Sequence, residues 1–100
     1  METFKIIAFE MIYQQETIQL SFSTAELVRV TEHGDRLWYV DINGVDDQEL
    51  LARFGRSEDI AIALTAVASS GQTFRGKGYF HPNEPHQAAA VRGDGELLEQ

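Results

Sequence analysis

Apolar and polar residues alternate along much of this chain with the two-residue period of half-buried β-strands. The clearest example is residues 17–23, in which every second side chain is apolar. Residues 4–13 are apolar on both faces and predict an opening strand. Residues 27–31 and 37–42 flank a polar loop with a glycine at position 34, which predicts a hairpin.

One segment has the signals of a helix instead. Asp46 and Glu49 lie three residues apart, as in a capping box, at the start of the stretch 48–54. Gly55 stands where a left-handed C-terminal cap belongs. We therefore predict one short helix near residues 47–54.

Residues 57–71 are compatible with two structures. Several alanines and the closing Gly71 would suit a helix. However, Ile60, Ile62 and Leu64 alternate, which favours a buried strand. We adopt the strand.

The last third of the chain adds further strand signals. Residues 73–81 alternate between an apolar and a polar face and predict a strand, entered through a hairpin loop at 69–72. Two prolines predict a loop at 81–85. Residues 88–99 predict a terminal hairpin that turns at Gly-Asp-Gly.

These elements predict a single domain over residues 1–100. Its class is α+β, dominated by β-structure: an antiparallel meander or barrel-like curved sheet of about six to eight strands with one short helix. The length suits one hydrophobic core, and a hydrophobic content of 43% is ordinary for a folded domain.

Composition and charge narrow the classes of function. The chain has 16 acidic and 8 basic residues, a formal charge of −8, which disfavours nucleic acid and suits basic partners. It has no cysteine, which excludes disulfides and thiolate chemistry and fits a reducing compartment. The first residues lack the features of a signal peptide, and the apolar run 60–68 is too short to span a membrane. We therefore expect a cytoplasmic protein without membrane contact.

The sequence Arg-Gly-Lys-Gly-Tyr-Phe at 75–80 partly resembles the first RNA-binding signature of RNA-recognition-motif domains. Four of its positions match, but Lys77 and Pro82 stand where two of the three stacking aromatic residues belong. Because those rings are missing and the chain is acidic, we predict no nucleic-acid binding.

Catalytic and metal-binding motifs are sparse. The serines lie in no nucleophile-elbow pattern, and no glycine-rich phosphate loop precedes a helix. His81 beside Tyr79 is the only acid–base couple that the spacing suggests. His81, Glu84 and His86 lie close in sequence, but a zinc site would need a further ligand such as His33 and a more regular spacing. We predict no catalytic residues, no metal and no cofactor.

The polar face of the strand predicted over residues 73–81 is the candidate binding site. Arg75, Lys77, Tyr79 and His81 project from this face, about 7 Å apart in succession. No carboxylate occurs between residues 60 and 83. Two cations, a phenol and an imidazole on one surface suit an acidic or anionic group. The alternative is that the two cations pair with acids of a neighbouring strand.

We therefore expect a small acidic domain that is a non-catalytic binding or interaction module. Its ligand would be a small anionic molecule, an acidic group of a protein or, through the acidic remainder, a basic protein, as for an inhibitor or immunity protein. Tyr39, expected to face outward beside a buried Trp38, can extend the binding surface. A small enzyme or small-molecule carrier with a pocket between sheet and helix is the alternative. Assembly through an edge strand would give a homodimer instead of a monomer.

Overall fold

The computed structural model describes residues 1–32 and 34–100 of the chain. The elements in this part are β1 (Glu2–Tyr13), β2 (Glu16–Gln19), β3 (Thr24–Glu32), β4 (Asp35–Asn43), α1 (Gln48–Arg56), β5 (Ala61–Ala68), β6 (Thr73–Asn83), the 3₁₀-helix η1 (Glu84–His86) and β7 (Ala88–Glu99). The predicted class is confirmed, because antiparallel strands dominate and α1 is a short helix.

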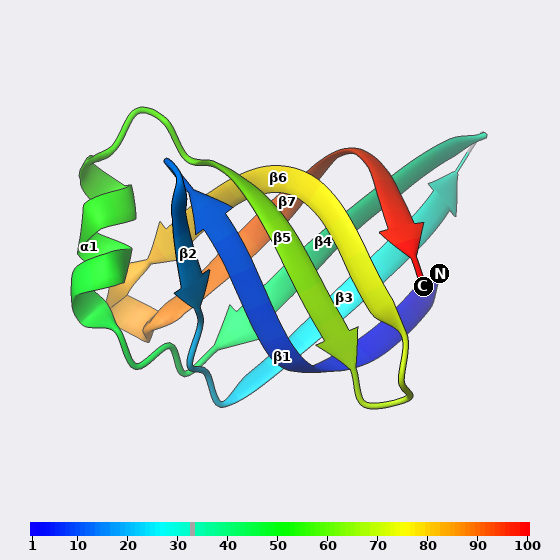
Figure 1. Cartoon of the computed structure of the whole chain (residues 1–100), viewed down its shortest axis with the longest axis horizontal. Coiled ribbons are helices and arrows are strands. Elements are labelled where there is room, and N and C mark those ends of the chain that lie inside the picture. The colour runs from blue at the N-terminus through cyan, green and yellow to red at the C-terminus, as the bar shows by residue number, and fades with distance from the viewer. Residues whose placement is uncertain (33) are drawn as a thin grey trace.

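Six strands close into a barrel in the order β1–β3–β4–β7–β6–β5, because β5 pairs back onto β1 (Figure 1). β2 lies outside this ring on the last part of β1. The β3–β4 hairpin is confirmed, and Gly34 has the positive φ of 84° that its loop requires. The strand predicted within 57–71 is confirmed as β5.

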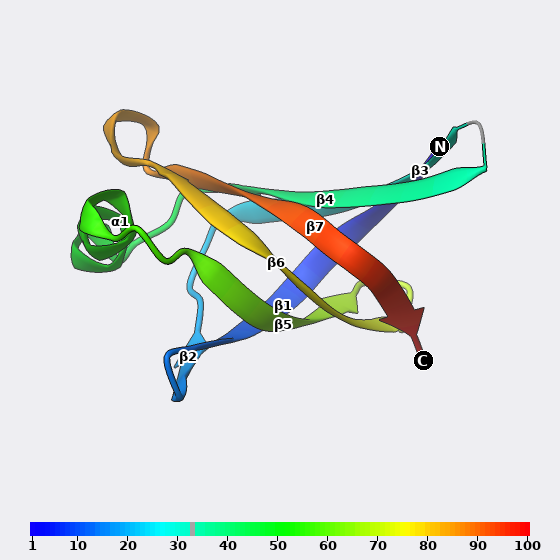
Figure 2. The same cartoon turned by 90° about the horizontal axis from the view of Figure 1, so that it is seen from above.

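The two ends of the barrel differ. In Figures 1 and 2, α1 covers one end, and both termini lie at the other. At that second end the ribbon formed by β3 and β4 projects beyond the neighbouring strands (Figure 2).

Inward side chains of the barrel strands pack into one hydrophobic core. Its most completely buried members, each at most 3% exposed, include Ile6, Phe9, Met11, Leu27, Val40, Ile42, Leu64, Phe74, Phe80 and Val91. Burying each large side chain contributes about 1.5–3 kcal/mol. Within the described part of the chain, every buried side-chain nitrogen or oxygen has a hydrogen-bond partner. The alternating sequence pattern therefore corresponds to an inside and an outside of the barrel.

Helix α1 closes its end of the barrel with an apolar stripe. Leu50, Leu51 and Phe54 are buried against the core. The Phe54 ring lies between Tyr13 and Phe80, with ring centres 4.3 and 4.4 Å away. The Tyr13 hydroxyl in turn donates to a backbone carbonyl just after the helix at 2.7 Å. The helix is thus fixed to β1 and β6 rather than resting on the barrel loosely.

The helix prediction was right in place but wrong at both caps. Asp47, not Asp46, is the N-cap, and its carboxylate accepts from the backbone N–H of Leu50 at 3.0 Å. Asp46 instead accepts from the Ser21 hydroxyl at 2.8 Å, which ties the turn to the chain before β3. Gly55 lies inside the helix, without a positive φ, because the helix continues to Arg56.

The strand predicted over residues 17–23 is only half formed, since β2 covers its first part. The N–H of Leu20 still donates to Phe9 on β1, whereas that of Ser23 already donates to Asn43 on β4 (both 2.9 Å). The backbone changes partners over these residues, so no single ladder covers them.

The predicted loop at 81–85 begins too early, because β6 continues through Pro82 to Asn83. The pairing of β6 with β5 ends at Tyr79. Pro82 is therefore paired on one side only, opposite Ala89 of β7. An edge position tolerates a residue without an N–H.

The predicted terminal hairpin is wrong: β7 is one bent strand that pairs with β6, with a bulge opposite residues 75–77. Two glycines allow the bend. A Cβ on Gly93 would lie 2.3 Å from the Trp38 indole, and Gly95 has a φ of +79°. The Trp38 indole N–H donates to the Gly95 carbonyl at 3.0 Å, which holds the bend from inside. As predicted, Trp38 is buried and Tyr39 is partly exposed to solvent.

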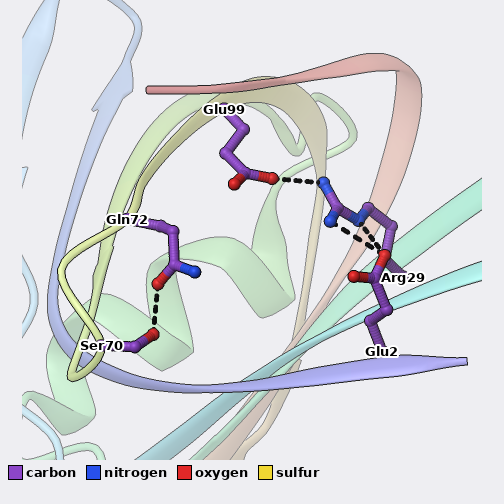
Figure 3. A network of polar contacts seen from close by, with 5 residues as sticks. All are labelled: Glu2, Arg29, Ser70, Gln72 and Glu99. Atoms are coloured by element: carbon purple, nitrogen blue, oxygen red, sulfur yellow. Dashed lines mark hydrogen bonds and ion pairs between the residues drawn. The ribbon is translucent and has the colours of Figure 1, made fainter.

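Arg29 joins the two ends of the chain at the barrel mouth near the termini (Figure 3). Its guanidinium lies 2.9 Å from a Glu2 oxygen and 2.8 Å from a Glu99 oxygen. It also lies over the rings of Phe4 and Phe74, 5.3 and 5.7 Å from their centres. The hydrogen bond to Glu99, opposed by burial and aided by the bond to Glu2, raises the pKa of Arg29. One guanidinium therefore links β1, β3 and β7.

We expect Arg29→Met to lower the free energy of unfolding by about 2 kcal/mol, because it removes two charge-assisted hydrogen bonds and two ring contacts. Urea denaturation followed by circular dichroism measures the loss. Arg56→Met is the control, since Arg56 is exposed at the end of α1, and it should change stability by less than about 0.5 kcal/mol. Equal denaturation midpoints for the two variants would show that Arg29 does not stabilise the closed barrel.

Candidate functional site

The geometry predicted for the polar face of residues 73–81 is confirmed in β6. Arg75, Lys77 and His81 are exposed and Tyr79 is half-buried, while the residues between them face the core. The four side chains therefore lie on the outer surface of the barrel.

Beside them, the first half of β5 supplies only small side chains to the outer surface: Ala61, Ala63 and Thr65. Ile12 of β1 lies opposite Ala63, which lies opposite Lys77. A depression therefore follows β5, with Ile12 on one side and Arg75 and Lys77 on the other. It consists of two adjoining hollows of about 440 and 210 Å³. We call it the β5 trough.

Acidic residues from other strands lie close to the trough, although β5 and β6 contain none. Asp94 of β7 is opposite Lys77, and its carboxylate accepts from the Tyr79 hydroxyl at 3.3 Å. Glu10 of β1 lines the trough, as do Asp94 and Glu96 of β7. Within residues 1–32 and 34–100, neither Arg75 nor Lys77 makes an ion pair. At Lys77, an acidic residue thus lies in the cross-strand position that the alternative requires, but the two side chains form no salt bridge.

The two residues paired with Arg75 on the neighbouring strands carry no charge. They are Thr65 on β5 and Leu98 on β7. Leu98 is 55% exposed. A guanidinium next to exposed apolar surface can bind a carboxylate or phosphate while the rest of that ligand contacts the apolar side chains.

His81 lies apart from the other three residues. It is beyond the part of β6 that pairs with β5, opposite Ala90 of β7. It lines a separate hollow of about 500 Å³ together with Asp41. The seven residues from Arg75 to His81 span about 20 Å in an extended strand. A single small ligand therefore contacts one end of the predicted face, and only an extended ligand reaches both.

Arg92 is a surface residue that the sequence did not indicate. It lies opposite Tyr39 of β4 on one side and Tyr79 of β6 on the other. Its guanidinium is 5.5 Å from the centre of the Tyr79 ring. The sequence predicted Arg92 as the last residue before a hairpin turn, and only the observed register of β7 shows it between two tyrosines.

In the described residues, no group of three or more His, Asp and Glu side chains is placed to hold a metal ion. His33, considered above as a further ligand, lies outside those residues. None of the described helices is long and apolar enough to cross a lipid bilayer.

Comparisons of the chain with protein-family models, curated proteins and solved structures found no match.

Proposed function

We propose that this domain is a non-catalytic binding module, and that its β5 trough accepts an anionic group attached to an apolar body. The ligand is a small molecule or the acidic group of a protein. The observation that carries the proposal is the composition of the trough. Arg75 and Lys77 line it from β6, Ile12 lines it from β1, and Ala63 and Thr65 of β5 lie between them. Glu10, Asp94 and Glu96 also line the trough, so a bound anionic group has to lie against the two cations and away from these carboxylates.

The two sides of the trough suit the two parts of such a ligand. Ile12 is 48% exposed, so an alkyl group placed against it removes apolar surface of both the ligand and Ile12 from water, which favours binding. Arg75 provides a planar guanidinium that binds a carboxylate through two parallel hydrogen bonds. Lys77 lies next to it on the same face, which adds a second positive charge. His81 remains part of the proposal for ligands long enough to reach it.

The alternative of a small enzyme or carrier requires a pocket between the sheet and α1. That space is occupied by Leu51 and Phe54, both 1% exposed, and by the Tyr13 ring. This packing favours a ligand on the outer surface over one enclosed under the helix.

A basic protein remains the second candidate partner, and one feature favours it. Glu26 of β3 and Asp41 of β4 lie directly opposite each other on the outer surface. Like charges in that position repel, and a basic side chain of a partner would relieve the repulsion. Lys5 of β1 is opposite Glu26 and compensates part of the charge.

We also propose a cytoplasmic location, since the chain has no cysteine that would need an oxidising compartment.

The proposal is tested with octanoate as a probe, which combines a carboxylate with an apolar chain. We expect saturable binding to the wild-type domain in saturation-transfer NMR. In the double variant Arg75→Gln/Lys77→Gln the dissociation constant should rise about tenfold or more, since each charge-assisted hydrogen bond contributes about 1.5–3 kcal/mol.

The matched control is Lys5→Gln/Arg56→Gln, which removes the same amount of charge from exposed positions away from the trough. This variant should bind octanoate like the wild type. Octylammonium, with the same chain and the opposite charge, should not bind in the trough. Equal affinity of both double variants for octanoate would reject the site.

A further inference from the structure

A second surface lies at the barrel mouth, where β4 and β7 separate. The two strands are paired from Asn43 opposite Ala88 to Tyr39 opposite Arg92, and there the register ends. From Trp38 back to Asp35, β4 is paired with β3 on its other edge. Figure 2 shows the β3–β4 ribbon continuing outward while β7 curves away from it.

The separation has a physical cause in the Trp38 side chain. Its indole lies under Gly93, where a Cβ would be 2.3 Å from the ring, and its N–H binds the Gly95 carbonyl. β7 is thereby held toward the inside of the barrel and toward β6. The edge of β4 over residues 35–38 is left without β7 beside it.

A cleft of about 910 Å³ occupies the space between the two strands, which we call the ribbon cleft. Arg36, Leu37 and Trp38 line it from β4, and Arg92, Gly93 and Leu97 line it from β7. Its size lies at the upper end of the range for ligand sites, about 300–1,000 Å³. Leu37 is 58% exposed, so the cleft offers apolar surface as well as charge.

The charges of the cleft differ from those of the rest of the molecule. Three of the chain's eight basic residues line it, namely Arg29, Arg36 and Arg92. Glu2 and Glu96 are the acids among its described lining residues, and Glu2 is bound to Arg29. In a chain of net charge −8, this is a local concentration of arginine that attracts acidic groups.

We propose that the ribbon cleft binds an extended acidic peptide segment of a partner protein. The segment pairs with β4 at residues 35–38 as an added strand, and its carboxylates contact Arg36 and Arg92. An open strand edge provides backbone hydrogen bonds for an added strand, and side chains beside it provide selectivity. A second copy of this chain fits less well, because a two-fold interface would place the same arginine-lined edge against itself. The ribbon cleft borders the β5 trough at Glu96, which lines both, but the proposal does not depend on binding in the trough.

The test uses a fluorescein-labelled peptide with the sequence Val-Glu-Val-Glu-Val-Glu-Val and measures fluorescence anisotropy. We expect the wild-type domain to bind it, and the matched peptide with lysine in place of glutamate to bind at least about tenfold more weakly. Arg36→Gln and Arg92→Gln should each weaken binding of the acidic peptide about tenfold. Arg56→Gln, far from the cleft on α1, should leave the affinity unchanged.

Two N-methylated forms of the peptide test strand pairing without any change to the protein. In an antiparallel pair, only every second N–H points to the neighbouring strand. Methylation of one alternate set of amides should abolish binding, and methylation of the other set should be tolerated. If both forms bind, or both peptide charges bind equally well, the proposal is wrong.

Two further outcomes would also overturn the proposal and identify another site or occupant. Loss of peptide binding in Arg75→Gln/Lys77→Gln, with Arg36→Gln unaffected, would assign the peptide to the β5 trough. A dimer in light scattering that Arg36→Gln dissociates in the absence of peptide would identify a second copy as the occupant. Conversely, failure of octanoate to bind would reject the proposed site in the β5 trough but would not contradict peptide binding in the ribbon cleft.

Discussion

Replacement of Phe54 by alanine is expected to lower the free energy of unfolding by about 3–5 kcal/mol, the range for loss of a fully buried phenylalanine. Phe54 is 1% exposed and its ring contacts both Tyr13 and Phe80. A helix of nine residues is too short to persist in water unless it is packed. We therefore expect α1 to separate from the barrel end. Urea denaturation measures the loss, and circular dichroism at 222 nm follows the helix.

The control for this prediction is Glu49→Ala, an exposed substitution in the first turn of the same helix. It should change the free energy of unfolding by less than about 0.5 kcal/mol. If Phe54→Ala were as stable as this control, α1 would not act as the closure of the barrel.

Gly93→Ala is expected to lower the free energy of unfolding by about 1–3 kcal/mol, the usual effect of overpacking. The added Cβ would lie 2.3–2.6 Å from three atoms of the Trp38 indole. The indole cannot move away without losing its hydrogen bond to Gly95. Because Trp38 is the single tryptophan of the chain, its fluorescence maximum should shift to the red together with the loss of stability.

The same substitution at Gly55 should have the opposite sign. There the nearest atom to an added Cβ is the flexible carboxylate end of Glu84, at 2.7 Å, and the residue lies inside α1. Alanine is favoured over glycine in a helix by about 0.5–1 kcal/mol, so Gly55→Ala should stabilise the domain. Equal effects at the two positions would mean that Gly93 is not required for the approach of Trp38.

Local patterns predicted the strands and the helix because each depends on residues close together in the sequence. The alternation of Ile60, Ile62 and Leu64 identified β5, and the alternation in residues 73–81 identified the outer face of β6. The position of α1 followed from the capping signals between residues 46 and 55. Its N-cap was misplaced by one residue because aspartate is favoured at that position and two adjacent aspartates are present, of which only Asp46 has a glutamate three residues later.

The predictions that failed depended on contacts between distant residues. Gly93 and Gly95 resemble a turn in sequence. Their role in the structure depends on contact with Trp38, which lies more than fifty residues earlier. Likewise, Pro82 suggested a loop because the sequence cannot show that β5 has already ended beside it.

The candidate site shows the same division. That Arg75, Lys77 and Tyr79 share one face follows from the period of a strand. That Asp94 lies opposite Lys77 follows from the bulged register of β6 and β7, which no local pattern specifies. A stretch without carboxylates in the sequence was therefore not a surface without carboxylates in space.

The most direct test of the proposed function is a titration of the ¹⁵N-labelled wild-type domain with octanoate, followed by amide chemical shifts. We expect saturable shifts at residues 61–65 of β5, along which the trough runs, and at residues 75–79 of β6, on one side of it. Octylammonium should not produce them. Shifts confined to α1 and the core residues beneath it would place the ligand under the helix, and they would contradict a binding site on the outer surface.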